Sequence, residues 1–221
     1  MRVKDSAVLG DFVYEQIKEM ILTRKIKCGE KIQEQLIEKE LGVSRTPVRE
    51  AVRRLSNEGI VVLYPNRHAE VISFDKQSIQ DLGMVRITMD CLAAQLSIQN
   101  GSNRDFDELK VIAEKCEAAH NQNDLFQQIS YDSQFHLKLV EISENSILIN
   151  ILNNILLKTQ LLQTALIEDT ASTVCDIHHH QVMMKALYER NLPDMLNAIQ
   201  SHLCPFYGIQ MQDIHPVQFQ L

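Results

Sequence analysis

Five histidines and one aspartate in the second half of the chain have the residue types and spacing of a metal site. Asp132 and His136 are four residues apart in a helical stretch, so a carboxylate and an imidazole project from one helix face. Three consecutive histidines at 178–180 and a further one, His202, follow in two later helical stretches. Three neutral imidazoles and one carboxylate suit Zn²⁺, Ni²⁺ or a similar divalent ion. This pattern predicts a metal site inside a helical bundle.

The same residues allow a plainer interpretation. A carboxylate and a histidine four residues apart are often only a surface ion pair. A histidine triplet is often only a polar stretch of helix. The spacing by itself leaves both interpretations open.

Arginines form a second group, near the N-terminus. Arg45, Arg49 and Arg53 recur every four residues and form one stripe beside an apolar helix face that starts at Val48. Arginine side chains on an exposed helix suit the DNA major groove, where each bidentate contact with guanine contributes about 1–3 kcal/mol. The alternative is a solvated face with ion pairs four residues apart.

Three short helices and a hairpin are expected to position these arginines. Helical spacing predicts helices over 11–25 and 31–40, and a third helix that Ser44 or Thr46 caps and Gly59 ends. The β-branched runs 61–64 and 69–74 flank a polar turn and predict a hairpin. We therefore expect residues 1–75 to form a winged helix-turn-helix domain.

The rest of the chain, residues 76–221, is expected to be an all-α bundle with roles in effector binding and dimerisation. The predicted helical stretches are 78–99, 103–120, 124–142, 146–168, 171–189 and 193–211. The sequence has no glycine-rich phosphate loop, no G-x-S-x-G and no H-E-x-x-H motif, which argues against the corresponding enzyme classes. The fold class is thus mainly α.

Charge, cysteine content and hydropathy further limit the kind of protein this can be and where it is found. Residues 1–75 carry 13 Lys and Arg against 12 Asp and Glu, whereas the remaining residues carry 9 against 17, so the net charge of −7 hides a basic N-terminal patch. The five cysteines form no C-x-x-C pair, which indicates reduced thiols. No run is long and apolar enough for a membrane helix, and the start lacks the apolar core of a secretion signal. We expect a cytoplasmic protein.

The stretch 41–71 closely resembles the DNA-binding domain of the GntR family of bacterial transcription regulators, and its run SRTPVREA (44–51) is highly specific. The resemblance implies that Arg45, Thr46 and Arg49 contact bases or nearby phosphates and that the wing tip enters the minor groove. The full set of expected DNA contacts is Ser44, Arg45, Thr46, Arg49, Arg53, Arg67 and His68.

Two positions in this stretch differ from the family pattern. Cys28 stands where the family usually has proline, and His68 stands where it usually has glycine. A histidine at a tight wing tip is strained if its φ is positive. The sequence preference of the wing is therefore left open.

Residues 76–211 look like the FCD domain of the FadR-type branch of the same family, in its six-helix, VanR-like form. In that domain an Asp-x3-His pair joins two later histidines, which implies the ligands Asp132, His136, His180 and His202. The resemblance makes His178 the less favoured choice and places His179 beside the ligands or at the surface. It also matches Arg86 to a family arginine on the first bundle helix, and Asp90 to a position that is usually glutamate. Bidentate pairing with a carboxylate and a plain surface salt bridge both stay open for this arginine. The polar residues of the fourth bundle helix are open candidates for a pocket lining: Asn153, Asn154, Lys158, Gln160 and Gln163.

The resulting hypothesis is a homodimeric transcription regulator, a repressor, that binds a two-fold symmetric operator in double-stranded DNA. A small organic acid bound at the metal site would control operator affinity. Three alternatives stay open: a direct metal sensor, a structural metal with no regulatory role, and a metalloenzyme that carries a DNA-binding head. We expect no enzymatic activity.

Overall fold

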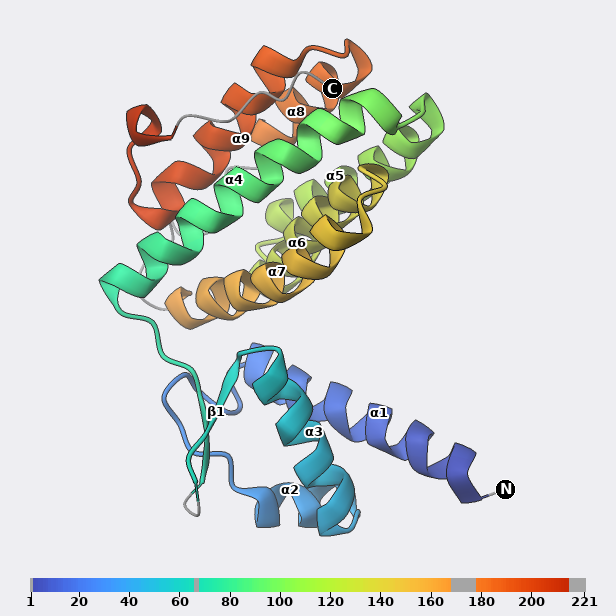
Figure 1. The fold of residues 1–221 in the computed structure, drawn as a ribbon, viewed down its shortest axis with the longest axis vertical. Coiled ribbons are helices and arrows are strands. Elements are labelled where there is room, and N and C mark those ends of the chain that lie inside the picture. The colour runs from blue at the N-terminus through green and yellow to red at the C-terminus, as the bar shows by residue number, and fades with distance from the viewer. Residues whose placement is uncertain (1, 66–67, 168–177, 215–221) are drawn as a thin grey trace. The chain divides into compact units, whose positions relative to one another are not determined.

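The structure, a computed structural model, describes residues 2–65, 68–167 and 178–214 (Figure 1). It divides the chain into two compact units, Met1–Phe74 and Asp75–Leu221. The predicted class is confirmed, since the first unit is a winged helix-turn-helix and the second is all-α.

Three helices and a two-stranded hairpin make up the first unit. Its elements are α1 (Arg2–Leu22), α2 (Glu34–Leu41), α3 (Arg45–Asn57), β1 (Val61–Leu63) and β2 (Ala69–Val71). α1 packs on α3, and the predicted apolar face of α3 is buried from Val48 to Leu55. Burial of that face is the main force that fixes α3 on the unit and leaves its arginines outside.

Turns connect these elements as the sequence predicts. Gly42 ends α2 in the left-handed conformation, with φ of 65°, and its N–H donates to the carbonyl of Glu38. The strands pair antiparallel, with Val61 opposite Val71 and Leu63 opposite Ala69. The tip of this hairpin, including Arg67, lies outside the described residues.

The second unit is built from helices that begin at clear N-caps. Its elements are α4 (Lys76–Asn100), α5 (Asn103–Asn121), α6 (Leu125–Ile142), α7 (Ser146–Leu166), α8 (His178–Tyr188), α9 (Leu192–Tyr207) and the 3₁₀ turn η1 (Met211–Asp213). Asp75 and Ser102 form capping boxes at the starts of α4 and α5. Side chains of Asp124, Asn145 and Asn191 cap the next helices in the same way.

The last helix ends earlier than the sequence predicts. The prediction that it reaches residue 211 is wrong, because α9 ends at Tyr207. Gly208 takes up a left-handed φ of 62° and donates its N–H to the carbonyl of Cys204, which closes the helix. The predicted start of the preceding helix, residues 171–177, lies outside the described residues.

α4 runs through the middle of the second unit. It contacts α9 on one side and α6 and α7 on the other (Figure 1). A side chain at Gly83 would collide with Tyr207, because a Cβ there would lie 2.3 Å from the ring carbon Cγ. The glycine thus allows α9 to approach α4 closely. A helix surrounded in this way buries polar as well as apolar positions, and Arg86 and Asp90 are both fully buried.

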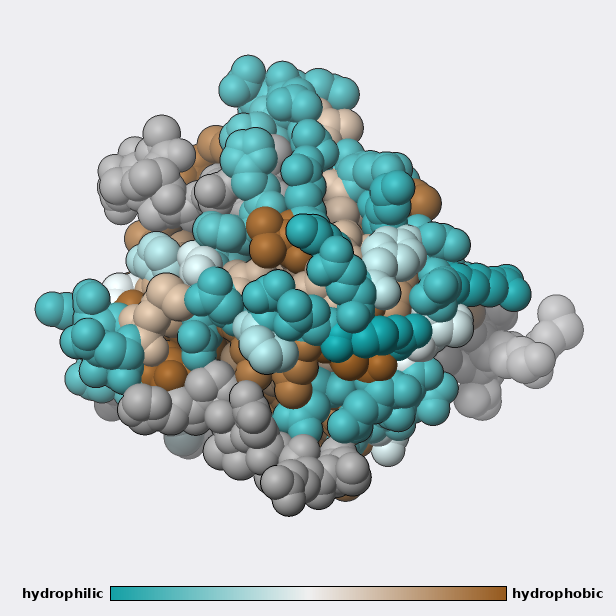
Figure 2. Space-filling view, turned by 90° about the horizontal axis from the view of Figure 1, so that it is seen from above, coloured by the Kyte–Doolittle hydropathy of each residue, from teal (hydrophilic) through white to brown (hydrophobic). Residues whose placement is uncertain are grey.

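Hydrophilic side chains cover most of the face shown in Figure 2, with hydrophobic ones between them. Within the described residues, no helix is both long enough and apolar enough to cross a membrane.

Candidate metal centre and nucleic-acid interface

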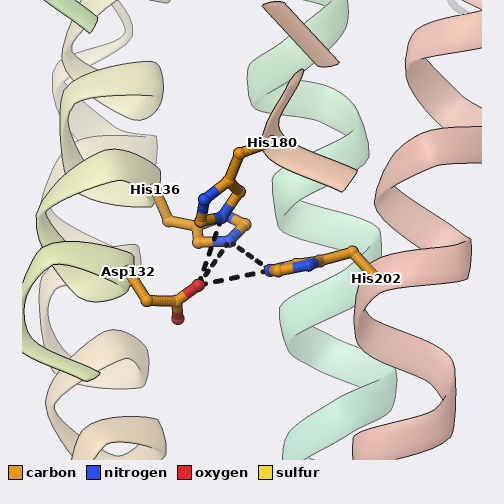
Figure 3. Close-up of side chains that lie close together, drawn as sticks. All are labelled: Asp132, His136, His180 and His202. Carbon is orange, nitrogen blue, oxygen red and sulfur yellow. Dashed lines mark hydrogen bonds and ion pairs between the residues drawn. The ribbon is translucent and has the colours of Figure 1, made fainter. Parts of the chain in front are cut away.

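Four of the residues singled out in the sequence meet in the interior of the second unit. Asp132 and His136 come from α6, His180 from α8 and His202 from α9 (Figure 3). All four are buried, and one ligand atom from each lies within 4.8 Å of the others. The plainer interpretation, a surface ion pair with an unrelated polar stretch, is therefore wrong for these side chains.

The facing atoms are the Oδ1 of Asp132 and the Nε2 of each histidine. Oδ1 lies 3.2 Å from His180 and 3.3 Å from His202, and the Nε2 atoms of His136 and His202 are 3.2 Å apart. Ligand atoms about 2.0–2.1 Å from a tetrahedral ion would be about 3.4 Å apart. The longest of these contacts, from His136 to Oδ1, is 3.8 Å. The donor set and its spacing therefore fit a divalent ion.

The buried polar atoms support the same conclusion. The Nε2 of His180 has no hydrogen-bond partner in the described residues, although it lies at ion-pair distance from Asp132. The nitrogen and the carboxylate oxygen are close, but the angles between them do not fit a hydrogen bond. Buried polar atoms usually have a partner, so ligand atoms that face one another without hydrogen-bond geometry favour a shared cation.

Electrostatics keep these ligands in the forms that bind metals. Burial opposes ionisation of Asp132, but the imidazoles that face its carboxylate, first those of His180 and His202, outweigh burial and hold the pKa of Asp132 well below its usual range. Burial lowers the pKa of His202 to about 3 and also lowers the pKa of His180. Near neutral pH these two imidazoles are therefore uncharged and present lone pairs, as metal binding requires.

A buried ion pair on α4 lies against this cluster. The Nε of Arg86 donates to Oδ2 of Asp90 at 3.1 Å, and both side chains are fully buried. The same Oδ2 lies 3.1 Å from Nδ1 of His136, at ion-pair distance but without hydrogen-bond alignment. Asp90 therefore places a carboxylate behind His136, whose other nitrogen faces the cluster. A carboxylate in that place orients an imidazole and makes it a stronger ligand.

The guanidinium of Arg86 has hydrogen-bond donors that its pairing with Asp90 does not use. Its two terminal amino groups are buried and have no hydrogen-bond partner in the described residues. The guanidinium is joined to the cluster through Asp90, whose Oδ2 lies 3.1 Å from both Nε of Arg86 and Nδ1 of His136. Unpaired buried donors of this kind are costly and indicate a partner that is polar or anionic.

The structure separates the three consecutive histidines. His180 joins the cluster, whereas the ring of His179 packs edge-on against His202 with centroids 5.9 Å apart. His178 is exposed. The histidine that faces the other ligands is thus the one favoured by the resemblance.

Sequence reasoning named the four side chains that converge here, but it left open which other residues contact them. Gln163 of α7 is buried and donates its amide to Oδ2 of Asp132 at 3.3 Å. Tyr207 shares a hydrogen bond of 2.9 Å with Thr159 and interacts electrostatically with Arg86. Helical spacing alone does not identify these contacts, since each joins residues from different helices.

The predicted DNA contacts on α3 are all exposed. Ser44 is the N-cap of α3, and Arg45, Thr46, Arg49 and Arg53 follow on its outer surface. His68 is partly buried, stacks on Tyr64 and lies 3.2 Å from a carboxylate oxygen of Glu70.

Comparison with known proteins agrees with both units. A family model described as "Bacterial regulatory proteins, gntR family" matches residues 9–71, and a model of the FCD domain matches residues 81–204. The Uxu operon regulator of Haemophilus influenzae is 30% identical over 220 residues, which cover 88% of this chain and 77% of that protein.

Other relatives match over a shorter length. The uncharacterized HTH-type transcriptional regulator YdhC of Bacillus subtilis is 32% identical over 64% of each chain. The transcriptional regulator McbR of Escherichia coli is 26% identical over 62% of each chain. These matches therefore span less than two thirds of the relatives' own length. The solved structure of McbR/YncC superposes with a TM-score of 0.77 at 20% identity, covering 90% of this chain and 97% of that one, which supports the fold.

The ligand assignment predicts a specific loss of metal. Metal analysis by mass spectrometry of tag-free protein, dialysed without chelator, should find about one divalent ion per chain. His202→Ala should lower this occupancy strongly, because one of four ligands is removed, while helix content measured by circular dichroism stays the same.

His179→Ala is the matched control, since it removes a neighbouring imidazole that does not face the other ligands. It should keep the occupancy of the wild type. Full occupancy in His202→Ala, or loss in His179→Ala alone, would show that the ligand register is wrong.

Proposed function

The chain belongs to the GntR family of bacterial regulatory proteins and carries an FCD domain, and from this premise we propose that it is a carboxylate-controlled repressor. It is a DNA-binding transcriptional regulator with an effector-binding domain. The proposal assigns operator recognition to residues 1–75, and effector binding and dimerisation to residues 76–221, in the cytoplasm. One observation carries it: the buried guanidinium of Arg86, whose amino groups have no hydrogen-bond partner in the described residues, pairs with Asp90, which lies against His136 of the four converging side chains.

The exposed stripe of α3 supports sequence-specific binding. Arg45 and Arg49 present guanidinium groups that match the O6 and N7 atoms of guanine in the major groove. Ser44, Thr46 and Arg53 lie beside them and suit phosphate or base contacts. Arg67 and His68 of the hairpin complete the proposed set of contacts.

Asp132, His136, His180 and His202 would hold the divalent ion, which is Zn²⁺, Ni²⁺ or a similar metal. When bound, such an ion would supply a positive charge that attracts an anionic oxygen of the effector. Arg86 would form two parallel hydrogen bonds to the carboxylate group of the organic acid whose oxygen approaches the ion. The chain thus offers both a cation site and an anion-binding fork, which fits a small organic acid better than a neutral ligand.

The effector must act by differential binding. It lowers operator affinity only if it binds the DNA-free conformation more tightly than the DNA-competent one. α4 is the element suited to carry this coupling, because it bears Arg86 and also contacts α6, α7 and α9.

A second copy of the chain is the proposed partner. α4 carries an apolar stripe of Val85, Met89, Leu92 and Leu96, and α7 carries one of Ile147, Ile151 and Ile155. The part-buried members of both stripes pack on one buried cluster, so the stripes border the same surface. A homodimer through this surface gives the two-fold symmetry of a palindromic operator.

A direct metal sensor is the second candidate, because the four protein ligands already form a complete set. Operator binding in the presence and absence of a chelator, with no organic acid added, distinguishes the candidates. Release of DNA by the metal alone supports the sensor, whereas a metal that changes only thermal stability is structural.

Arg49→Ala should weaken binding to the operator by about 1–3 kcal/mol, which is the energy of one bidentate base contact. The measurement is fluorescence anisotropy with a duplex selected by the wild-type protein from a random library. Arg104→Ala, which removes an 89% exposed arginine of the second unit, is the control for net charge. Equal affinities of the two variants would exclude Arg49 from the interface.

A panel of mono-, di- and tricarboxylates should contain a compound that releases the wild-type protein from this duplex. Arg86→Lys keeps the charge beside Asp90 but lacks the planar fork, so half-release should need at least about tenfold more of that compound. Arg104→Lys should respond like the wild type. If no carboxylate releases the metal-loaded protein, the proposed effector class is wrong.

The dimer surface makes a prediction of its own. Light scattering should give a mass of twice the 25.4 kDa of one chain. Ile151→Glu places a charge in the shared apolar surface and should shift the protein toward monomers. Val111→Glu, at a similarly exposed apolar residue of α5, should leave the dimer intact. The proposal fails if both variants dissociate alike or if the wild type is a monomer.

A further inference from the structure

Two glutamates of α2 face the two arginines at the start of the stripe on α3. Glu34 and Glu38 are four residues apart, so they project from one side of α2. An oxygen of Glu38 lies 3.2 Å from Nε of Arg45, and an oxygen of Glu34 lies 3.2 Å from Nε of Arg49. The contacts form a two-step ladder between the helices.

The two sides of this ladder differ in exposure. The glutamate side chains are 29% and 21% exposed, whereas those of Arg49 and Arg45 are 58% and 54% exposed. The carboxylates therefore lie partly between the helices, and the guanidinium groups project outward from them. The glutamates can therefore hold the arginine side chains in place while the guanidinium groups stay accessible.

Each contact uses Nε. The guanidinium has five N–H donors in a rigid fork, and the two amino groups at its tip are the ones that pair end-on with guanine. A glutamate bound at Nε restricts the rotation of the side chain and leaves this tip for a base. The geometry is therefore compatible with base recognition while the ion pair stays intact.

The other arginines of α3 are treated differently. Arg54 is held from α1, by a carboxylate oxygen of Asp11 at 2.8 Å and by the ring of Tyr14, whose centroid is 3.8 Å away. In the part of the chain that the structure describes, no salt bridge to Arg53 is found. Only the first two arginines of the stripe are held by acidic residues of α2.

We propose that Glu34 and Glu38 determine DNA specificity by positioning Arg49 and Arg45 for base contacts and by opposing contacts with phosphate. This inference rests on the proposed role of the two arginines in DNA binding. A carboxylate beside the guanidinium repels the phosphate backbone, so non-specific binding is weakened by every glutamate that reaches the interface. A base contact is neutral and escapes this repulsion.

Glu34→Gln tests the inference, because the amide keeps the shape of the side chain and removes its charge. Affinity for a scrambled duplex should rise about two- to fivefold, the range of one exposed ion pair. Affinity for the selected duplex should not rise, since Arg49 is no longer held. The ratio of the dissociation constant for the scrambled duplex to that for the selected duplex should therefore fall by more than about twofold.

Glu40→Gln is the matched control. It makes the same substitution on the same helix, but Glu40 pairs with Lys25 and not with an arginine of the stripe. It should change both affinities by the same factor and leave their ratio within about twofold. Equal ratios for Glu34→Gln and Glu40→Gln would overturn the inference, provided that both variants unfold at the wild-type temperature.

A double-mutant cycle separates this inference from the proposed function. In an Arg49→Ala background, Glu34→Gln should change the ratio no more than Glu40→Gln does, because Glu34 acts through Arg49. If Arg49→Ala itself has no effect, the proposed role of Arg49 fails. If Arg49→Ala weakens binding but Glu34→Gln has the same effect in both backgrounds, only the role of Glu34 fails.

A second selection from the random duplex library gives an independent measure. The sequences bound by Glu34→Gln should show a weaker preference at the base pair read by Arg49 and an unchanged preference elsewhere. A loss of stability alone would lower binding to all sequences alike. An unchanged preference at that base pair would contradict the inference.

Discussion

Two carboxylates, Asp90 and Asp132, lie in the interior of the helical unit, and their burial constrains everything packed around them. A charge removed from water is tolerated only with partners close by. For Asp90 these partners are Arg86 on its own helix and His136 on α6. For Asp132 they are histidines of α8 and α9 and an amide of α7. Compensation of these two charges thus involves residues of α4, α6, α7, α8 and α9.

The winged unit follows the opposite rule. Its core is apolar, and the charged groups of α3 stay in water, where each ion pair contributes little to stability. Weak pairs suit this surface because a DNA partner must displace or share them. The acidic residues of α2 therefore contribute little to the stability of the unit, which agrees with the role proposed for them in selecting DNA.

Local patterns explain how much of this could be predicted from the sequence. The apolar period beginning at Val48 and the turn at Gly42 predicted the recognition helix correctly. The four-residue spacing of Asp132 and His136 placed both on one face of α6. Contacts between helices could not be predicted from such patterns. Asp90 was noted only because it departs from the family pattern, and nothing in the sequence connected Glu34 with Arg49. Pairing across helices depends on how the helices pack, which residue spacing does not determine.

The contact between His202 and Asp132 joins positions 70 residues apart, and this separation has a consequence for the growing polypeptide. Such a contact closes a long loop and forms only after the intervening helices are in place. During synthesis, which delivers the N-terminus first, the winged unit is complete once residue 74 has emerged. The cluster around Asp132 cannot form until α9, which carries His202, has been synthesised. A nascent chain therefore completes the unit proposed to bind DNA before it completes the unit proposed to bind the effector.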